Sequence, residues 1–131
     1  MNFKELYDNV AQSINPQQVN KMVSSCSEMA VIETKEGNTY YGASMNARCG
    51  LGITAEQAAI ANMVTYGEFE IAKIVIVRAD GSLVMPGGVS RELMLELSPA
   101  NSEAEILMDV ERQKMVKLGK LLPLWWGESE Y

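Results

Sequence analysis

The chain has 131 residues, 47% of them hydrophobic, which is the length and composition expected of one globular domain spanning residues 1–131. Its formal net charge of −6 argues against a nucleic acid or an anionic membrane as the main partner, because phosphate binding needs clustered Lys and Arg. The chain contains no histidine, which excludes Ser-His and Cys-His catalysis as well as His-based metal sites.

The sequence shows no sign of a membrane span or a secretion signal. No apolar run reaches the roughly 18 residues that a spanning helix needs, and Met1–Glu5 lacks the basic-then-apolar pattern of a signal peptide. Cys26 and Cys49 are too few for a disulfide framework. We therefore expect a cytoplasmic protein with reduced cysteines, in which Cys49 is a small buried residue rather than a nucleophile.

The first segment has the spacing of an amphipathic helix. Its apolar residues recur at steps of three and four: Phe3, Leu6, Val10 and Ile14. This pattern predicts a helix that Asn2 caps and that ends near Asn15–Pro16. The polar residues 17–27 are predicted to continue the helix or to form a loop.

A hairpin and a second helix are predicted next. Residues 29–34 and 39–43 have the composition of two strands, and the turn 35–38 joins them. A loop to about residue 53 leads to a helix over 54–66, which Gly67 ends. The alanines of this helix indicate that one of its faces lies close against a sheet.

The second half of the chain alternates strands and a helix. The nearly unbroken apolar run 71–77 predicts a central strand. A helix over 86–97, strands over 104–109 and 114–118, and a closing segment over 121–126 follow. A hairpin followed by crossover helices predicts an α/β sandwich around a mixed sheet of about five strands.

Two glycine-containing segments that open helices carry a resemblance to a known family. Asn46–Gln57 reads N-A-R-C-G-L-G-I-T-A-E-Q, and Pro86–Glu92 reads P-G-G-V-S-R-E. They resemble the two zinc-binding motifs of the cytidine deaminases, N-A-x-x-x-L-x-x-C-A-E-R and P-C-G-x-C-R-Q. The segments Thr34–Gly37, Arg91–Leu97 and Lys120–Pro123 are similar to further family segments in the same order. The resemblance implies a three-layer α/β/α cytidine deaminase-like sandwich.

The resemblance also assigns the family's catalytic positions. The three zinc ligands fall on Thr54, Gly87 and Ser90, and the glutamate that shuttles a proton falls on Glu56. In the family, zinc activates a water that attacks C4 of cytosine. Neutral hydroxyls are poor zinc ligands beside thiolate or imidazole, and Gly87 has no side chain. We therefore expect no zinc and no other cofactor.

The nucleoside-binding positions are altered as well. The family's N-x-E ribose motif has no glutamate here, and Ser44 stands near the position of its asparagine. By resemblance, the candidate substrate contacts are Ser44, Asn46, Thr54, Ala55, Gly87, Gly88 and Ser90.

These residues also have structural interpretations. Glu56 is either a surviving proton shuttle or a first-turn carboxylate that the helix macrodipole favours by about 0.3–1 kcal/mol. Thr54, with Gln57 three residues later, is expected to form a capping box. Ser90 is expected to make a hydrogen bond within the first turn of its own helix. Gly87–Gly88 fits either a tight turn or the close approach of a substrate. With zinc lost, the N–H groups at the two helix N-termini need a new acceptor, which is Glu56, water or a bound anion.

Three hypotheses for the function follow. The first is a cytidine deaminase-like protein without deaminase activity, acting as a binding or structural module. The second is a nucleoside deaminase for cytidine or deoxycytidine with an atypical site, and the third is a domain that binds an anion or small metabolite. We expect a homo-oligomer, either a tetramer as in the family or a dimer, in which Trp125–Trp126 packs or reaches a neighbouring subunit. The expected ligand is nucleoside-like or anionic.

Overall fold

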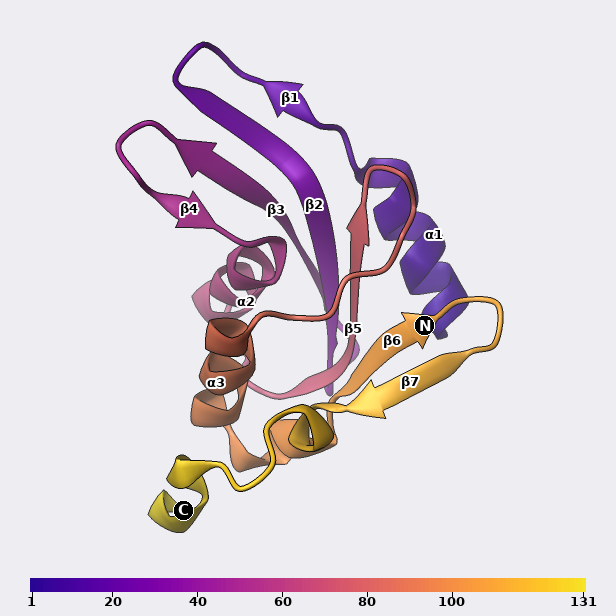
Figure 1. The fold of residues 1–131 in the computed structure, drawn as a ribbon. Coiled ribbons are helices and arrows are strands. Elements are labelled where there is room, and N and C mark those ends of the chain that lie inside the picture. The colour runs from indigo at the N-terminus through magenta and orange to yellow at the C-terminus, as the bar shows by residue number, and fades with distance from the viewer.

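In the computed structural model, which describes residues 1–131, seven strands form one mixed sheet with helices on both faces (Figure 1). The strand order is β4-β3-β2-β5-β6-β7, and β1 pairs with β2. The strands are β1 (Gln17–Gln18), β2 (Val23–Thr34), β3 (Thr39–Ala47), β4 (Gly52–Ile53), β5 (Ile71–Arg78), β6 (Glu105–Asp109) and β7 (Lys114–Lys117). The α-helices are α1 (Phe3–Ser13), α2 (Ala55–Thr65) and α3 (Gly88–Leu97), and short 3-10 helices cover Pro99–Glu103, Leu118–Leu121 and Trp126–Glu130. None of the helices is long and apolar enough to cross a membrane.

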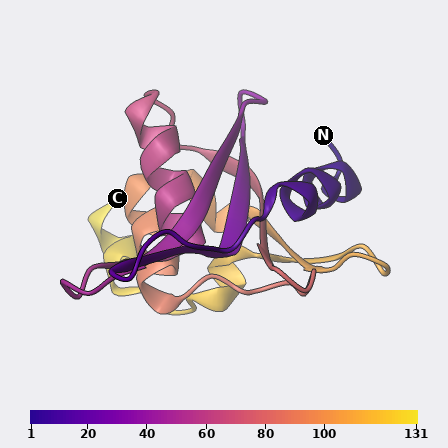
Figure 2. The same cartoon turned by 90° about the horizontal axis from the view of Figure 1, so that it is seen from above.

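Two hydrophobic cores lie on the two faces of this sheet. Alternate residues of a strand point to opposite sides, so Ile32 and Ile74 belong to the core under α2 and α3. Their sequence neighbours Val31 and Val75 belong to the core under α1. Figure 2 shows α1 on the other side of the central strands from α2. The predicted α/β/α sandwich is confirmed. Strands β5 and β6 are the one parallel pair of the sheet, and α3 lies in the crossover connection between them.

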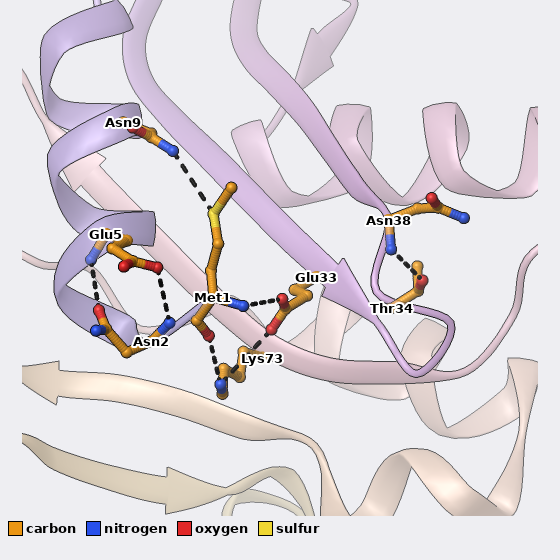
Figure 3. A network of polar contacts seen from close by, with 8 residues as sticks. All are labelled: Met1, Asn2, Glu5, Asn9, Glu33, Thr34, Asn38 and Lys73. Carbon is orange, nitrogen blue, oxygen red and sulfur yellow. Dashed lines mark hydrogen bonds and ion pairs between the residues drawn. The ribbon is translucent and has the colours of Figure 1, made fainter.

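Polar contacts fix the start of α1 (Figure 3). Asn2 Oδ1 accepts a hydrogen bond from Glu5 N at 2.9 Å, and Glu5 Oε2 accepts one from Asn2 N at 3.2 Å, which confirms the predicted cap. The Met1 ammonium lies 2.6 Å from Oε1 of the buried Glu33, and Lys73 Nζ lies 3.6 Å from Oε2. Because Glu33 is on β2 and Lys73 on β5, these contacts hold the helix to the central strands.

The N-terminal half of the sheet differs from the prediction. The sheet has seven strands rather than about five, because the two-residue strands β1 and β4 extend it. The prediction of helix or loop for residues 17–27 is wrong, since they contain β1 and the first part of β2. Cys26 has left-handed backbone geometry, with φ +62°, and the register of β2 against β3 shifts between Ser25 and Met29. Such a bulge breaks the period-two pattern that identifies a strand.

Helix α2 lies directly on β3 at Gly42. A Cβ atom at Gly42 would lie 2.1 Å from the Ala59 backbone nitrogen and 2.5 Å from the Ala55 carbonyl oxygen, so only glycine fits. The predicted close packing of this helix against the sheet is confirmed. The contact fixes the first turn of α2, which carries Glu56, near the middle of β3.

Candidate functional site

Thr54 is the residue at which α2 begins. Its Oγ1 accepts a hydrogen bond from Gln57 N at 3.2 Å, and Gln57 Oε1 accepts one from Thr54 N at 3.2 Å. These two bonds form the predicted capping box, in which each side chain satisfies a backbone N–H at the helix terminus. The Thr54 hydroxyl is therefore committed to its own helix.

Glu56 turns from the first turn of α2 toward the start of α3. It is 2% exposed, and its Oε1 accepts hydrogen bonds from Gly87 N at 3.1 Å and from Ser90 Oγ at 3.0 Å. Its Oε2 is buried and has no hydrogen-bond partner. The expected turn of Glu56 toward these donors is confirmed. Ser90 bonds this carboxyl group, and the prediction that it bonds within its own helix is wrong because an acceptor from α2 lies within reach.

The backbone conformation at the start of α3 does not require glycine at positions 87 and 88. Gly87 is the N-cap of α3, with φ −68° and ψ 167°, a conformation open to any residue. A Cβ on Gly87 would meet only Glu56 Oε1, at 4.0 Å, and a Cβ on Gly88 would meet nothing within 4 Å. Their interpretation as a tight turn is therefore wrong. Because Gly87 has no side chain, α3 has no cap of its own.

A polar pocket lies beside the N-terminus of α2. Its volume is about 370 Å³, and its lining residues are Ser27, Glu28, Ser44, Asn46, Gly52, Ile53 and Thr54. Ser44 Oγ accepts a hydrogen bond from Glu28 N at 3.0 Å and shares another with Ser27 Oγ at 3.0 Å. The wall contains Ile53 as its one apolar side chain and no Lys or Arg. Three candidate substrate contacts, Ser44, Asn46 and Thr54, therefore meet at one pocket.

The three-dimensional likeness to solved structures decides the fold. No family model matches the sequence, and no curated protein matches it in a sequence comparison. A point mutant of cytidine deaminase from Mycobacterium tuberculosis is 22% identical to this chain, with a TM-score of 0.79 over 100% of this chain and 99% of that chain. The chain has the cytidine deaminase fold. The unmutated cytidine deaminase of Mycobacterium tuberculosis is 23% identical, with a TM-score of 0.76 over 97% of this chain and 98% of that chain. The cytidine deaminase of Burkholderia pseudomallei is 23% identical, with a TM-score of 0.71 over 95% and 98% of the two chains.

The resemblance to cytidine deaminases implies a zinc ion, and the residues present do not fit one. Thr54 and Ser90 offer neutral hydroxyls that already make hydrogen bonds, and Gly87 offers no side-chain atom. Zinc prefers thiolate, imidazole and carboxylate ligands. No three His, Cys, Asp or Glu side chains in the structure are grouped so that they could hold a metal ion. The chemistry of the donor set thus departs from that of the zinc-binding motifs.

The remaining candidates are not part of the wall of the polar pocket. Ala55 is fully buried, and Gly88 lines a separate hollow on the outer side of α3. Glu56, Gly87 and Ser90 make the contact between the two helices, which is buried at Ser90 and partly buried at Gly87, and they are not part of the pocket wall. Within the cytidine deaminase fold of this chain, the predicted site is therefore divided into a polar pocket and a buried carboxylate contact.

Four residues of the pocket wall were not predicted from the sequence: Ser27, Glu28, Gly52 and Ile53. Ser27 and Glu28 follow the bulge at Cys26, which sets their position on β2, and Gly52 and Ile53 form β4. A second pocket of about 270 Å³ shares Ser27 with the first, and it also shares Ser44 and Asn46. The residues 17 and 18 of β1 line this second pocket. The only local signal was a run of serines around Cys26, which has no specific structural meaning.

The two cysteines are free and lie in different environments. Cys26 is buried, and Asn15 N donates a hydrogen bond to its Sγ at 3.4 Å. Cys49 is exposed, so the prediction that it is buried is wrong. It lies in the turn between β3 and β4, next to Gly50 at φ +95°, where the chain reverses at the surface.

Proposed function

We propose that this chain is a cytidine deaminase-like protein that does not deaminate and that acts as a binding module for a small polar molecule. The observation that carries the proposal is the engagement of Glu56 with Gly87 N and Ser90 Oγ. A proton shuttle has to reach its substrate or an activated water, whereas this carboxylate is 2% exposed and contacts α3. The lack of thiolate and imidazole ligands at positions 54, 87 and 90 supports the same conclusion.

The polar pocket is the proposed binding site. Its volume of about 370 Å³ lies in the range of small-molecule sites, roughly 300–1,000 Å³. Its wall offers the amide of Asn46 and the carboxylate of Glu28, beside the hydroxyls of Ser44 and Thr54, which already make hydrogen bonds within the protein. Hydroxyl, amide and carboxylate groups suit a neutral ligand with several hydroxyls, such as a nucleoside. An anionic ligand is disfavoured because the wall contains Glu28 and no Lys or Arg, and the nearest cation, Arg78 Nε at 3.9 Å from Glu28 Oε1, is already paired with that carboxylate.

A deamination assay tests the absence of activity. We expect no ammonia from cytidine or deoxycytidine in a coupled assay, and no stoichiometric zinc in the purified protein. Turnover that the Glu56→Gln variant abolishes would instead establish a nucleoside deaminase with an atypical site. Turnover that the variant leaves unchanged would come from a contaminating enzyme.

Nucleoside binding is tested separately by thermal shift. We expect cytidine or uridine to raise the melting temperature with dose, because a ligand that binds only the folded state stabilises it. The Asn46→Ala variant should weaken this shift, since Asn46 is an exposed residue of the pocket wall. Asn9→Ala, on α1 and away from the pocket, is the matched control. Equal shifts in both variants would place binding elsewhere.

We further propose that the protein is a homo-oligomer, a tetramer or else a dimer. Several large apolar side chains are exposed in the isolated chain: Val19, Met22, Leu51, Leu124 and Trp126. Leu124 is fully exposed and Trp126 is 63% exposed, both near the C-terminal end of the sequence given. These residues lie at two places, the loops beside β1 and β4 and the C-terminal segment (Figure 1), and exposed apolar groups at either place favour association with another protein surface.

A further inference from the structure

We propose that Glu56 is a metal-free cross-link that holds the N-termini of α2 and α3 together. This inference concerns what stabilises the fold and goes beyond the proposed function. It begins from the misfit between zinc and the residues at positions 54, 87 and 90. At the point toward which the two helices converge, the structure has a carboxylate oxygen that accepts two hydrogen bonds from α3.

Helix α3 depends on an acceptor from elsewhere in the chain. Its N-cap is Gly87, which makes no side-chain cap, and its first turn contains no acidic residue. The first N–H groups of a helix have no partner within the helix, and the positive end of its dipole favours an anion. Glu56, 31 positions earlier in the sequence, supplies both a hydrogen-bond acceptor and a carboxylate.

Burial makes this contact stronger than a surface contact of the same geometry. Glu56 is 2% exposed and Ser90 is 1% exposed, so water does not compete with the bond between them. Apart from this contact, α2 and α3 touch each other at few points, since α2 packs mainly on β3 and β2 whereas α3 packs mainly against the 3-10 helix Pro99–Glu103. The carboxylate is therefore the main polar tie between the two helices.

The contact uses one oxygen of the carboxylate. Oε1 makes both bonds, whereas Oε2 is buried without a partner. A glutamine at position 56 would keep the oxygen acceptor and would place its NH2 group at the buried Oε2 position, which makes no hydrogen bond in the protein. The Glu56→Gln variant therefore separates the hydrogen bonds, which it retains, from the negative charge, which it removes.

Urea unfolding of matched variants tests the cross-link. We expect Glu56→Ala to lower the folding equilibrium constant at least tenfold, because it leaves the buried Ser90 hydroxyl without an acceptor and removes the acceptor of the Gly87 N–H. Glu56→Gln should lower the constant less. The control is Glu96→Ala, which changes an exposed glutamate of the partner helix α3 and should change the constant by less than about threefold.

A double-mutant cycle identifies the partner. We expect Ser90→Ala to lower the folding constant when Glu56 is present and to have almost no effect when Glu56 is alanine, because both changes remove the same bond. Additive effects of the two substitutions would overturn the proposal. If Glu56→Ala does not fold, Glu56→Leu, which fills similar space without an acceptor, provides the test, with faster exchange of the Gly87 amide expected than in Glu56→Gln, which keeps the acceptor. Equal exchange in these two variants would overturn the proposal.

Metal analysis of the same samples completes the test. We expect the unfolding curve of the unmodified protein to be unchanged by a chelator. Stoichiometric zinc whose removal lowers stability would overturn the proposal, because a metal ion would then supply the cross-link.

Discussion

The Tyr40 hydroxyl donates a hydrogen bond to the Glu68 carboxylate, which ties the first residues of β3 to the loop that follows α2. Asn38 Nδ2 donates a second bond to the same oxygen at 2.9 Å. Glu68 is 8% exposed, and the ring of Tyr40 stacks on that of Tyr66 with centroids 5.8 Å apart. This polar cluster lies at the other end of β3 from the proposed pocket, so its titration affects the fold without involving the pocket.

The cluster predicts a loss of stability at high pH. The hydrogen bond to Glu68, together with burial, raises the pKa of Tyr40 to about 12 from its usual value of 10.0. A pKa raised by folding stabilises the folded state below the unfolded pKa, and this contribution is lost as pH rises through the folded pKa. We expect the free energy of unfolding to fall between about pH 10 and 12 more steeply than in Tyr40→Phe. Parallel curves in urea unfolding would contradict this.

The same cluster predicts a loss of stability in acid. The hydroxyl of Thr34, then that of Tyr40, holds the pKa of the Glu68 carboxyl below its usual value of 4.5. A pKa lowered by folding stabilises the folded state above the unfolded pKa, and this contribution is lost as pH falls through the folded pKa. We expect Glu68→Gln to reduce the dependence of the unfolding free energy on pH below about 4.5. Glu111→Gln, an exposed glutamate, is the control and should leave that dependence unchanged.

The local signals of the sequence predicted much of the fold. The cap at Asn2, the capping box at Thr54 and the helix stop at Gly67 each depend on residues within a few positions, and all three are confirmed. The central strand at 71–77 was predicted because burial on both faces gives an unbroken apolar run. The strands in 17–27 could not be predicted, because the left-handed Cys26 breaks their pattern.

The candidate site could be predicted only in part. Family motifs identified Glu56 and Ser90, and the sequence left open whether the first was a proton shuttle or a helix-terminal carboxylate. The role of Glu56 depends on which groups of α3 face its carboxyl group. Its partner Ser90 is 34 positions away in the sequence, so no local pattern indicates this contact. Glu28 joins the pocket because β2 bulges before it, and no spacing in the sequence indicates such a bulge.

The close approach of α2 to β3 predicts a large cost for any side chain at Gly42. An alanine Cβ would lie 2.1 Å from a backbone nitrogen, so the helix would have to move away from the sheet. We expect Gly42→Ala to lower the free energy of unfolding by about 3 kcal/mol, in the upper part of the range for overpacking. Gly88→Ala is the matched control, because its Cβ meets nothing within 4 Å. Urea unfolding should show this control to be unchanged or slightly stabilised. Similar losses in both variants would contradict the prediction.

The exposed apolar residues near the C-terminal end predict self-association. Leu124 is 100% exposed, and its backbone is left-handed at φ +56°, a conformation unfavourable for a branched side chain. Such a residue is costly in an isolated chain, and contact with a second copy would bury its side chain. We expect light scattering at micromolar concentration to give the mass of a tetramer or dimer.

Leu124→Asp should shift this mass toward the monomer, because a charge buried in an apolar contact is unfavourable. Met108→Asp, which changes a 49% exposed methionine on β6, is the control. A monomer mass for the unmodified protein would contradict the prediction, as would an equal shift in both variants.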